Sequence, residues 1–329
     1  PEVLALRDLP DPEPGPGDVL VRIHRSGVNP TDWKARAGSG PGATVDPAQT
    51  PGQDGAGVVE AVGAGVEPAL VGLRVWVWEA AHGRPAGGTA QELAVLPARQ
   101  VVTLPDAASY DLGACLGVPF VTAHRCLTVA EEGPARLGPG ALHGRTVLVA
   151  GGAGAVGNAA IQLARWSDAT VLTTISSPRK AQLAAAAGAD HVIDYRTQDV
   201  AAEVRKVARD GVDVVVEVAA AQNAALDAAV VAQHGTVAIY AAAPGDEATF
   251  PVRTLMSTNA RLQFVLLYTA PDRAKGLAVE DVSAAVLTGA VRVGEDAGLP
   301  LHHFPLAGTA DAHRAVQDGA VGKVLVDVT

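Results

Sequence analysis

The stretch TVLVAGGAGAVGNAAIQLARW, residues 146–166, carries the most specific motif of the sequence. An apolar run at 146–150 leads into Gly152, Gly154 and Gly157, which have the spacing G-x-G-x-x-G and open an amphipathic helix. We expect Gly152 to permit a tight turn, Gly154 to let the backbone approach a pyrophosphate, and Gly157 to let the helix pack on the strand. The alternative is a tight strand-to-helix turn that binds no ligand.

Two further features of the first turn of this helix favour phosphate binding. The backbone N–H groups of Ala155, Val156 and Gly157 have no partner within the helix, and the positive end of the helix dipole lies there. We therefore expect these residues to bind the phosphates of a dinucleotide cofactor.

The end of the next expected strand indicates which dinucleotide is bound. NAD-binding domains usually have Asp or Glu there, bonded to a ribose hydroxyl, whereas this chain has Ser176 and Ser177, followed by Arg179 and Lys180. Hydroxyl groups and cations bind a 2′-phosphate that a carboxylate would repel. The sequence therefore predicts NADP(H), with Ser176, Arg179 and Lys180 at the phosphate. Solvated charges at a helix start are the alternative, although cations oppose the helix dipole there.

The pattern around this stretch predicts an α/β chain. From about residue 146, apolar runs alternate with helical stretches, which is typical of a doubly wound parallel sheet covered on both faces. Residues 1 to about 110 have short apolar stretches between Gly and Pro, typical of a β-rich, barrel-like domain, and 301–329 predicts strand, helix, strand. The expected strands of the second half are 146–150, 170–175, 191–193, 212–216, 236–240 and 262–267, and its helices include 155–165, 178–187 and 200–208.

Length and composition exclude several classes of protein. A chain of 329 residues with 48% hydrophobic residues has room for two domains with sizeable cores. With 25 basic and 35 acidic residues the net charge is −10, and no basic stripe suits a nucleic acid. We expect no membrane span and no signal peptide. Two cysteines, Cys115 and Cys126, predict reduced thiols in a cytoplasmic protein, and the start at Pro1 without Met suggests that a native N-terminal segment is missing.

Several ordered blocks of the sequence resemble one family. They are SGVNPTDWKAR (26–36), TPGQDGAGVVEAVGAGV (50–66), LGVPFVTAHRCL (116–127), the glycine-rich turn and GKVLV (322–326). Together they resemble the zinc-independent quinone oxidoreductase (zeta-crystallin-like) branch of the medium-chain dehydrogenases/reductases. The resemblance implies a GroES-like β-barrel catalytic domain, residues 1–117 and 290–329, and a Rossmann NADP(H)-binding domain, residues 118–289.

The resemblance also bears on metal chemistry. Zinc alcohol dehydrogenases of this superfamily carry a cysteine before the Thr-Asp pair and a His-Glu pair after Pro-Gly, where this chain has Asn29 and Gln53-Asp54. Amides do not replace a thiolate and an imidazole on zinc, so we predict no catalytic zinc. Hydride delivery to an acceptor that delocalises the charge is then easier than alcohol oxidation.

The implied function is therefore an NADPH-dependent quinone reductase. One alternative is an enoyl or 2-alkenal reductase that acts on α,β-unsaturated carbonyls. Another, of a different class, is a non-catalytic nucleotide-binding protein, crystallin-like or RNA-binding, although the net charge of −10 argues against RNA. Relatives pair the edge strand of the nucleotide domain, so the resemblance also implies a homodimer through Leu262–Tyr268.

The resemblance assigns individual site residues. It places Asn29 and Thr122 near the nicotinamide, with Asn29 as the candidate catalytic residue; its amide, or a water, could serve a developing oxyanion. It places Lys180 and Tyr195 at the 2′-phosphate. The remaining implied contacts are Val218 and Ala219 at the adenosine ribose, Tyr240 and Ala241 beside the nicotinamide, and Phe264, Val265, Leu266 and Lys323 near the cofactor. Capping of a strand or helix, or core packing, is the alternative for Tyr195, Thr122 and Tyr240.

Two features leave alternatives open. His124 stands where relatives commonly have tyrosine; it either bonds the cofactor or substrate, or is a satisfied core histidine. Trp76 and Trp78 alternate with valines in one expected strand, so both face one side. They either line a pocket for an aromatic acceptor or fill the core.

Overall fold

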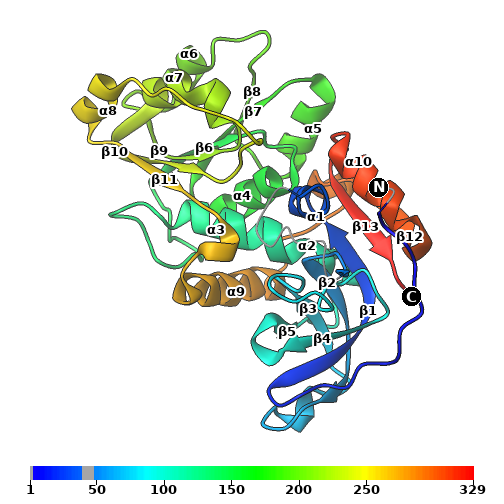
Figure 1. The fold of residues 1–329 in the computed structure, drawn as a ribbon. Helices are drawn as coiled ribbons and strands as arrows, with labels where there is room; N and C mark the ends of the chain where they lie inside the picture. Colours follow the sequence, from blue (N-terminus) through cyan, green and yellow to red (C-terminus); the bar gives the residue numbers. More distant parts are fainter. Residues whose placement is uncertain (1–2, 39–47) are drawn as a thin grey trace. The chain divides into compact units, whose positions relative to one another are not determined.

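The computed structural model describes residues 3–38 and 48–329 (Figure 1). The chain divides into two compact units, one that ends at Val118 and resumes as Pro300–Thr329, and one formed by Pro119–Leu299. The second unit thus extends past residue 289, because Asn158 Nδ2 donates to the Ala297 carbonyl at 2.8 Å and Arg292 N donates to Gln162 Oε1 at 2.8 Å. In the described part of the chain, no helix is long and apolar enough to span a membrane.

The second unit contains a six-stranded sheet in the order β11-β10-β9-β6-β7-β8, and all its strand pairs are parallel. The chain enters at β6, runs outward to β8 and returns through β9, which is the doubly wound arrangement predicted. The strands are β6 (Thr146–Ala150), β7 (Thr170–Ile175), β8 (His191–Asp194), β9 (Val212–Glu217), β10 (Val231–Ile239) and β11 (Arg261–Phe264). The helices are α3 (Val121–Leu127), α4 (Ala155–Trp166), α5 (Pro178–Ala186), α6 (Val200–Val207), α7 (Ala220–Val230), α8 (Val252–Thr258) and α9 (Asp272–Leu287).

Local capping explains where two of these helices begin. The Ser177 hydroxyl accepts a hydrogen bond from Lys180 N at 3.3 Å, and Pro178 occupies the first position of α5. At α6, Asp199 Oδ1 accepts from Ala202 N at 3.1 Å. Both helices agree with the predicted ranges 178–187 and 200–208 to within one residue.

Two strands differ from the prediction. β10 begins at Val231, which pairs with Val212, and its register shifts before Thr236 around a left-handed His234 (φ 61°). β11 ends at Phe264, where a strand to residue 267 was expected. Leu267 and Tyr268 are both buried. A strand would turn these successive side chains to opposite faces, whereas a short 3₁₀ turn at Leu267–Thr269 buries both of them.

The first unit contains a seven-stranded sheet in the order β12-β13-β1-β2-β3-β5, with β4 also paired to β1. The C-terminal segment forms strand, helix, strand as predicted. The strands are β1 (Asp18–Val28), β2 (Asp54–Val62), β3 (Arg74–Val77), β4 (Leu93–Pro97), β5 (Val101–Thr103), β12 (Leu301–Pro305) and β13 (Lys323–Asp327), and the helices are α1 (Pro30–Arg36), α2 (Tyr110–Cys115) and α10 (Thr309–Gln317). Trp76 lies in β3, whereas Trp78 follows the end of that strand; both are buried.

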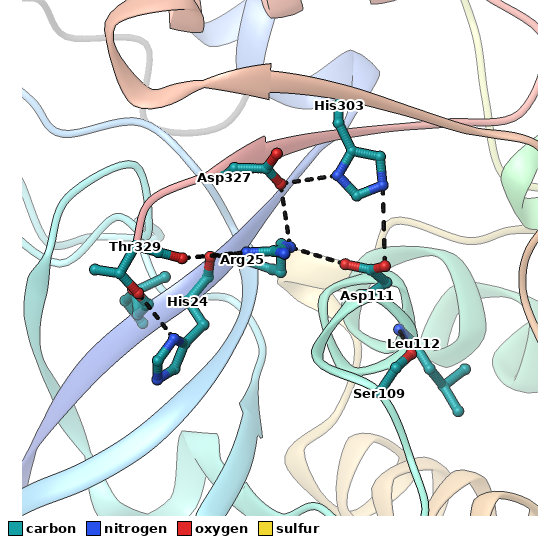
Figure 2. Close-up of polar contacts among 9 residues, drawn as sticks. His24, Arg25, Ser109, Asp111, Leu112, His303, Asp327 and Thr329 are labelled. Atoms are coloured by element: carbon teal, nitrogen blue, oxygen red, sulfur yellow. Dashed lines mark hydrogen bonds and ion pairs between the residues drawn. The ribbon is translucent and has the colours of Figure 1, made fainter.

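A polar network ties the C-terminal strands to β1 and α2 (Figure 2). Arg25 Nε of β1 lies 2.8 Å from Asp111 Oδ1 of α2 and 3.1 Å from Asp327 Oδ1 of β13. On β12, His303 Nδ1 lies 2.8 Å from the same Asp327 oxygen. These contacts hold the end of β13 at Asp327, and the antiparallel pairing with β1 extends from there to Val324, next to Lys323.

The two cysteines are free and buried. Burial raises the pKa of both thiols, that of Cys115 to about 12. Both therefore stay protonated near neutral pH and are poor nucleophiles.

Candidate functional site

The glycine-rich turn links β6 to α4 at the carboxyl edge of the parallel sheet (Figure 1). Its left-handed residue is Gly151 (φ 70°), whereas the G-x-G-x-x-G spacing predicted the tight turn at Gly152. Gly152 is required because a Cβ there would lie 2.1 Å from Oγ1 of Thr173 in β7. A Cβ on Gly157 would lie 2.4 Å from the Gly151 carbonyl oxygen, so α4 packs on the turn too closely for a side chain.

Gly154 has no such internal explanation. A Cβ there would meet only the Gly151 oxygen, at 3.5 Å, and its backbone angles (φ −83°, ψ 162°) suit any residue. Gly154 is exposed and is the N-cap residue of α4, so no side chain caps the helix. The N–H groups of Ala155, Val156 and Gly157 therefore have no capping side chain, an arrangement that is suited to an anion.

Polar residues gather at the carboxyl ends of β7 and β8. Lys180 Nζ donates to Ser176 Oγ at 3.2 Å, so these two predicted phosphate contacts do lie together. Tyr195 directly follows β8, its backbone N donates to the Ile175 carbonyl at 3.1 Å, and its side chain is exposed. Ser176, Lys180 and Tyr195 therefore belong to one corner of the sheet.

Two arginines near this corner differ from the expectation. Arg179 forms an ion pair with Glu295, so its guanidinium already has a carboxylate partner. Arg196, which the sequence analysis did not select, donates from Nη1 to the Ser176 carbonyl at 3.5 Å. The sequence could have identified Arg196 as a candidate phosphate contact, because this cation directly follows Tyr195 in I-D-Y-R.

The end of β9 holds an acidic pair that the sequence did not suggest. Glu217 is buried; its Oε1 accepts from Ala219 N, and Asn223 Nδ2 donates to the same oxygen at 3.1 Å. Asp227 is also buried, and burial together with the nearby Glu217 raises its pKa to about 9. Asp227 is therefore protonated at neutral pH, and the pair supports the turn that contains Val218 and Ala219.

The other predicted cofactor residues of this unit have mixed surroundings. Tyr240 directly follows β10 and is half-buried, with its backbone N bonded to the Glu217 carbonyl at 3.0 Å; Ala241 comes next. Thr122 is buried within α3. Of the segment after β10, Val265 is buried, whereas Phe264 and Leu266 are exposed.

His124 is a buried residue of α3, and its partner is a carboxylate. Its Nε2 lies 2.8 Å from Asp281 Oδ2 of α9, and Asp281 also accepts from Arg136 Nε and Leu137 N, each at 2.7 Å. Although burial opposes the charge, these hydrogen bonds lower the pKa of Asp281. The geometry favours the core interpretation of His124, but only its Nε2 is satisfied, because its buried Nδ1 has no hydrogen-bond partner among the described residues. Asp281 joins α9 to α3 through His124 and to the segment around Arg136 through Arg136 and Leu137.

Asn29 belongs to a buried polar cluster in the first unit. Its Oδ1 accepts from Lys323 Nζ at 2.6 Å, and its Nδ2 donates to Asp54 Oδ2 at 2.7 Å. Its backbone N donates to Asp32 Oδ2 at 2.7 Å, and all four residues are buried. The Asn29 amide is thus held between a cation and a carboxylate, and it could serve an oxyanion only if one of these hydrogen bonds gave way.

This cluster does not fit a zinc ion. Asn29 and Gln53 offer amide groups, and the Lys323 ammonium, which would repel a metal cation, lies 3.4 Å from Asp54 Oδ2. Within residues 3–38 and 48–329, no group of three or more His, Cys, Asp or Glu could hold a metal. Burial raises the pKa of Asp32 to about 7 and also raises that of Asp54, so these carboxyls are further weakened as ligands.

Comparisons with known proteins cover both units. The alcohol dehydrogenase GroES-like domain family matches residues 15–106, and the zinc-binding dehydrogenase family matches residues 155–283. The second name refers to zinc, but its matched residues include neither Asn29 nor Gln53, so the match does not bear on the metal positions.

Individual relatives agree with these families over the full length. Human quinone oxidoreductase is 30% identical over 332 residues, which cover 99% of this chain and 94% of the relative. A solved NAD-dependent alcohol dehydrogenase has a TM-score of 0.82 at 26% identity, covering 100% of this chain and 96% of that one. A mycobacterial protein complexed with NADPH has a TM-score of 0.77 at 28% identity, and the match covers 99% of this chain and 96% of that one.

These matches confirm the GroES-like and Rossmann-type units that the resemblance implied. The chain belongs to the quinone oxidoreductase branch of the medium-chain dehydrogenase/reductase superfamily, and it is an NADP(H)-binding oxidoreductase of that type.

Proposed function

We propose that this oxidoreductase uses NADPH to reduce quinones and that it works without zinc. The observation that carries the proposal is the position of Asn29, which is hydrogen-bonded to Lys323 and Asp54 where zinc relatives have a metal-binding cysteine. When bound, NADPH supplies the hydride. Without a Lewis acid to activate an alcohol, the suitable substrate is an acceptor that is already electrophilic, and a quinone delocalises the arriving charge over its ring.

The cofactor contacts divide between two parts of the second unit. The glycine-rich turn, with Gly154 and the first N–H groups of α4, is suited to the pyrophosphate. Ser176, Lys180, Tyr195 and Arg196 are suited to the 2′-phosphate, since they offer hydroxyls and two cations at one corner of the sheet. Arg179 contributes less, because Glu295 already neutralises it.

Steady-state oxidation of NADPH by a panel of quinones and enones tests the proposal, alongside oxidation of primary alcohols with NADP⁺. We expect turnover with quinones at a rate that dialysis against a chelator leaves unchanged, and no stoichiometric zinc by mass spectrometry of the metal content. A preference for enones by more than about tenfold would assign the protein to the enoyl or alkenal reductases. Alcohol oxidation that is lost on chelation would contradict zinc independence, and tight NADPH binding without any turnover would contradict an enzymatic role.

We also propose that the protein is a homodimer through the edge of the nucleotide sheet. β11 is the edge strand, and Phe264 at its end is 69% exposed. An open hollow of about 1000 Å³ adjoins it, lined by apolar residues such as Phe250, Met256 and Leu262 and also by Glu131, His234 and Asn259. An exposed strand edge beside a partly apolar hollow favours pairing with a second copy.

A further inference from the structure

Lys323 places a buried positive charge between the side chains that replace the metal-binding residues of zinc relatives. It is 2% exposed, and its Nζ contacts Asn29 and Asp54. We propose that the Lys323 ammonium group is a catalytic residue that takes over the electrostatic role of the metal: it donates a hydrogen bond to the acceptor oxygen on which hydride transfer places negative charge. This inference rests on the proposed function, and it changes the role of Lys323 from the general cofactor contact that the resemblance implied.

The hydrogen bonds of Lys323 leave one donor for a ligand. An ammonium group has three N–H donors; Asn29 Oδ1 accepts one at 2.6 Å, and Asp54 Oδ2 accepts another at 3.4 Å. Among the residues that the structure describes, the third has no acceptor. A buried cationic donor without an acceptor is unfavourable, so an oxygen from a bound molecule is the expected third partner.

Asp54 forms a buried ion pair with Lys323, but its shorter hydrogen bonds go to other donors. Its Oδ1 accepts from Val118 N at 2.8 Å, and its Oδ2 accepts from Asn29 Nδ2 at 2.7 Å, both shorter than the 3.4 Å to Lys323 Nζ. The carboxylate therefore has two short hydrogen bonds from neutral donors in addition to its longer contact with Lys323. It orients the ammonium, while the shorter bond of Lys323 goes to the neutral amide of Asn29.

Two glycines make room for this arrangement. A Cβ on Gly27 of β1 would lie 2.0 Å from the Ala114 carbonyl oxygen and 3.1 Å from Lys323 Cε, so a side chain there would displace the lysine. A Cβ on Gly117 would lie 2.1 Å from Asp54 Oδ1. The lack of side chains at Gly27 and Gly117 thus leaves the space that Lys323 and Asp54 occupy. A charge that is already in place stabilises a transition state without reorganisation.

A polar atom next to Asp54 in the sequence, Gln53 Oε1, also lacks a hydrogen-bond partner among the described residues. Gln53 stands at the second metal position, and its Oε1 is buried with no hydrogen-bond donor among residues 3–38 and 48–329. An orphaned acceptor at this position and a spare donor on Lys323 are the two groups that a bound polar molecule or water would satisfy.

The charge balance of the step is simple. The acceptor gains a hydride with its electron pair and is reduced, while NADPH is oxidised to NADP⁺; the displaced π electrons become a lone pair on the acceptor oxygen. Lys323 bonds this oxyanion and keeps its own proton. The oxygen then takes a proton from water, so Lys323 is unchanged at the end of the reaction.

The first test measures charge stabilisation without turnover. p-Nitrophenol is titrated in the presence of the protein and NADP⁺, and the phenolate absorbance reports its pKa when bound. The variants are Lys323→Met, Lys323→Arg and the double variant Lys323→Met/Asp54→Asn; Lys275→Met, which removes another buried lysine, in α9, is the control. We expect the native protein, Lys275→Met and Lys323→Arg to lower the pKa of bound nitrophenol, and the other two variants to weaken phenolate binding roughly tenfold or more.

The double variant keeps the test valid if Lys323→Met does not fold. Removing the lysine alone leaves Asp54 charged and buried, which is costly. Removing both charges avoids this, and the Asn29 amide can then rotate to match the new amide that Asp54→Asn introduces. A double variant that binds nitrophenolate as tightly as the native protein would overturn the proposal.

The second test uses quinones of graded reduction potential. We expect the double variant to lose roughly 100-fold in kcat on the weakest acceptors and less than about tenfold on the strongest, with NADPH affinity within about twofold of native. An equal loss on all acceptors would mean a structural role, and weakened NADPH binding alone would mean a cofactor contact; either overturns the proposal. If the native protein reduces no acceptor, the proposed function fails, and the nitrophenol titration still decides the role of Lys323.

Discussion

The Oδ1 atom of Asn29 accepts a hydrogen bond from Lys323 Nζ at 2.6 Å, across a separation of 294 residues in the chain. The contact is made possible by the pairing of β13 with β1, in which Val324 lies opposite Val28. It joins the residue that replaces the metal-binding cysteine of zinc relatives to a fixed cation. The contact places the positive charge of Lys323 beside Asn29 in the first unit.

Reversing the charge of Lys180 should change cofactor preference. Lys180 Nζ lies 3.2 Å from Ser176 Oγ at the proposed 2′-phosphate corner. In Lys180→Glu a carboxylate would repel the phosphate, so we expect NADPH to bind at least about tenfold more weakly and NADH to bind as before. Fluorescence titration with both cofactors measures this, with Lys206→Glu, an exposed lysine of α6, as the control. An unchanged preference would refute the phosphate assignment.

Two glycines of the same turn should respond differently to alanine. In Gly154→Ala the new methyl group has room, so we expect little change in the melting temperature but NADPH binding weakened about tenfold or more, because the methyl group blocks the pyrophosphate. In Gly152→Ala the methyl group would collide with Thr173, and we expect a loss of stability of about 1–3 kcal/mol. Thermal unfolding and NADPH titration of both variants test this; normal NADPH binding by Gly154→Ala would contradict a pyrophosphate at this position.

His313 should make stability depend on pH. Burial, with a smaller effect from the positive Arg36, lowers its pKa from 6.5 to about 4. The folded state therefore binds fewer protons than the unfolded state. The contribution of His313 to the free energy of unfolding is fully present above pH 6.5 and is lost as the pH falls towards 4. At about 1.36 kcal/mol per pKa unit the loss is on the order of 3 kcal/mol.

The measurement compares urea unfolding of the native protein and His313→Leu from pH 7.5 to 4.5. The difference in unfolding free energy between the two proteins should move in favour of His313→Leu as the pH falls. Taking this difference removes the opposite contribution of Asp32, whose raised pKa of about 7 stabilises the folded state at low pH. Parallel curves for the two proteins would show that His313 does not titrate in this way.

Replacing His124 should affect stability rather than substrate binding. Its Nε2 is bonded to the buried Asp281, so His124→Phe removes one partner of that carboxylate, and we expect about 1–3 kcal/mol of destabilisation. Because Arg136 and Leu137 still hold Asp281, the variant should fold. Its KM for quinones should stay within about twofold of native; a large rise in KM at normal stability would instead place His124 at the substrate.

A charge on the edge strand should prevent dimer formation. Phe264 is exposed at the end of β11, and in Phe264→Glu two copies would bring like charges together at an apolar edge. We expect the native mass, measured by light scattering after gel filtration, to fall from two chains to one. Leu287→Glu, at an equally exposed leucine of α9, should leave the mass unchanged. A native protein that is already monomeric would contradict the proposed dimer.

The nucleotide unit could be predicted from the sequence because its determinants are local. The strands 146–150 and 170–175 and the starts of α4, α5 and α6 agree with the apolar runs, helical stretches and glycines that predicted them. The proposed phosphate corner was also accessible, since Ser176 and Lys180 are only four residues apart and lie together in the structure. Short-range patterns of this kind are set by backbone geometry, which a single sequence expresses directly.

Other features depend on contacts between distant parts of the chain. Lys323 was expected near the cofactor, but no local pattern in the sequence predicts its pairing with Asn29. The same holds for the bond between His124 and Asp281 across 157 residues and for the early end of β11. Each depends on which distant groups share a buried site, where an unpaired charge or polar atom is costly. Local patterns were enough to predict the domain classes and the strand-to-helix turn proposed to hold the pyrophosphate. The partners of the buried charges arise from packing, because only the folded chain brings a carboxylate, an amide and an ammonium group out of water together.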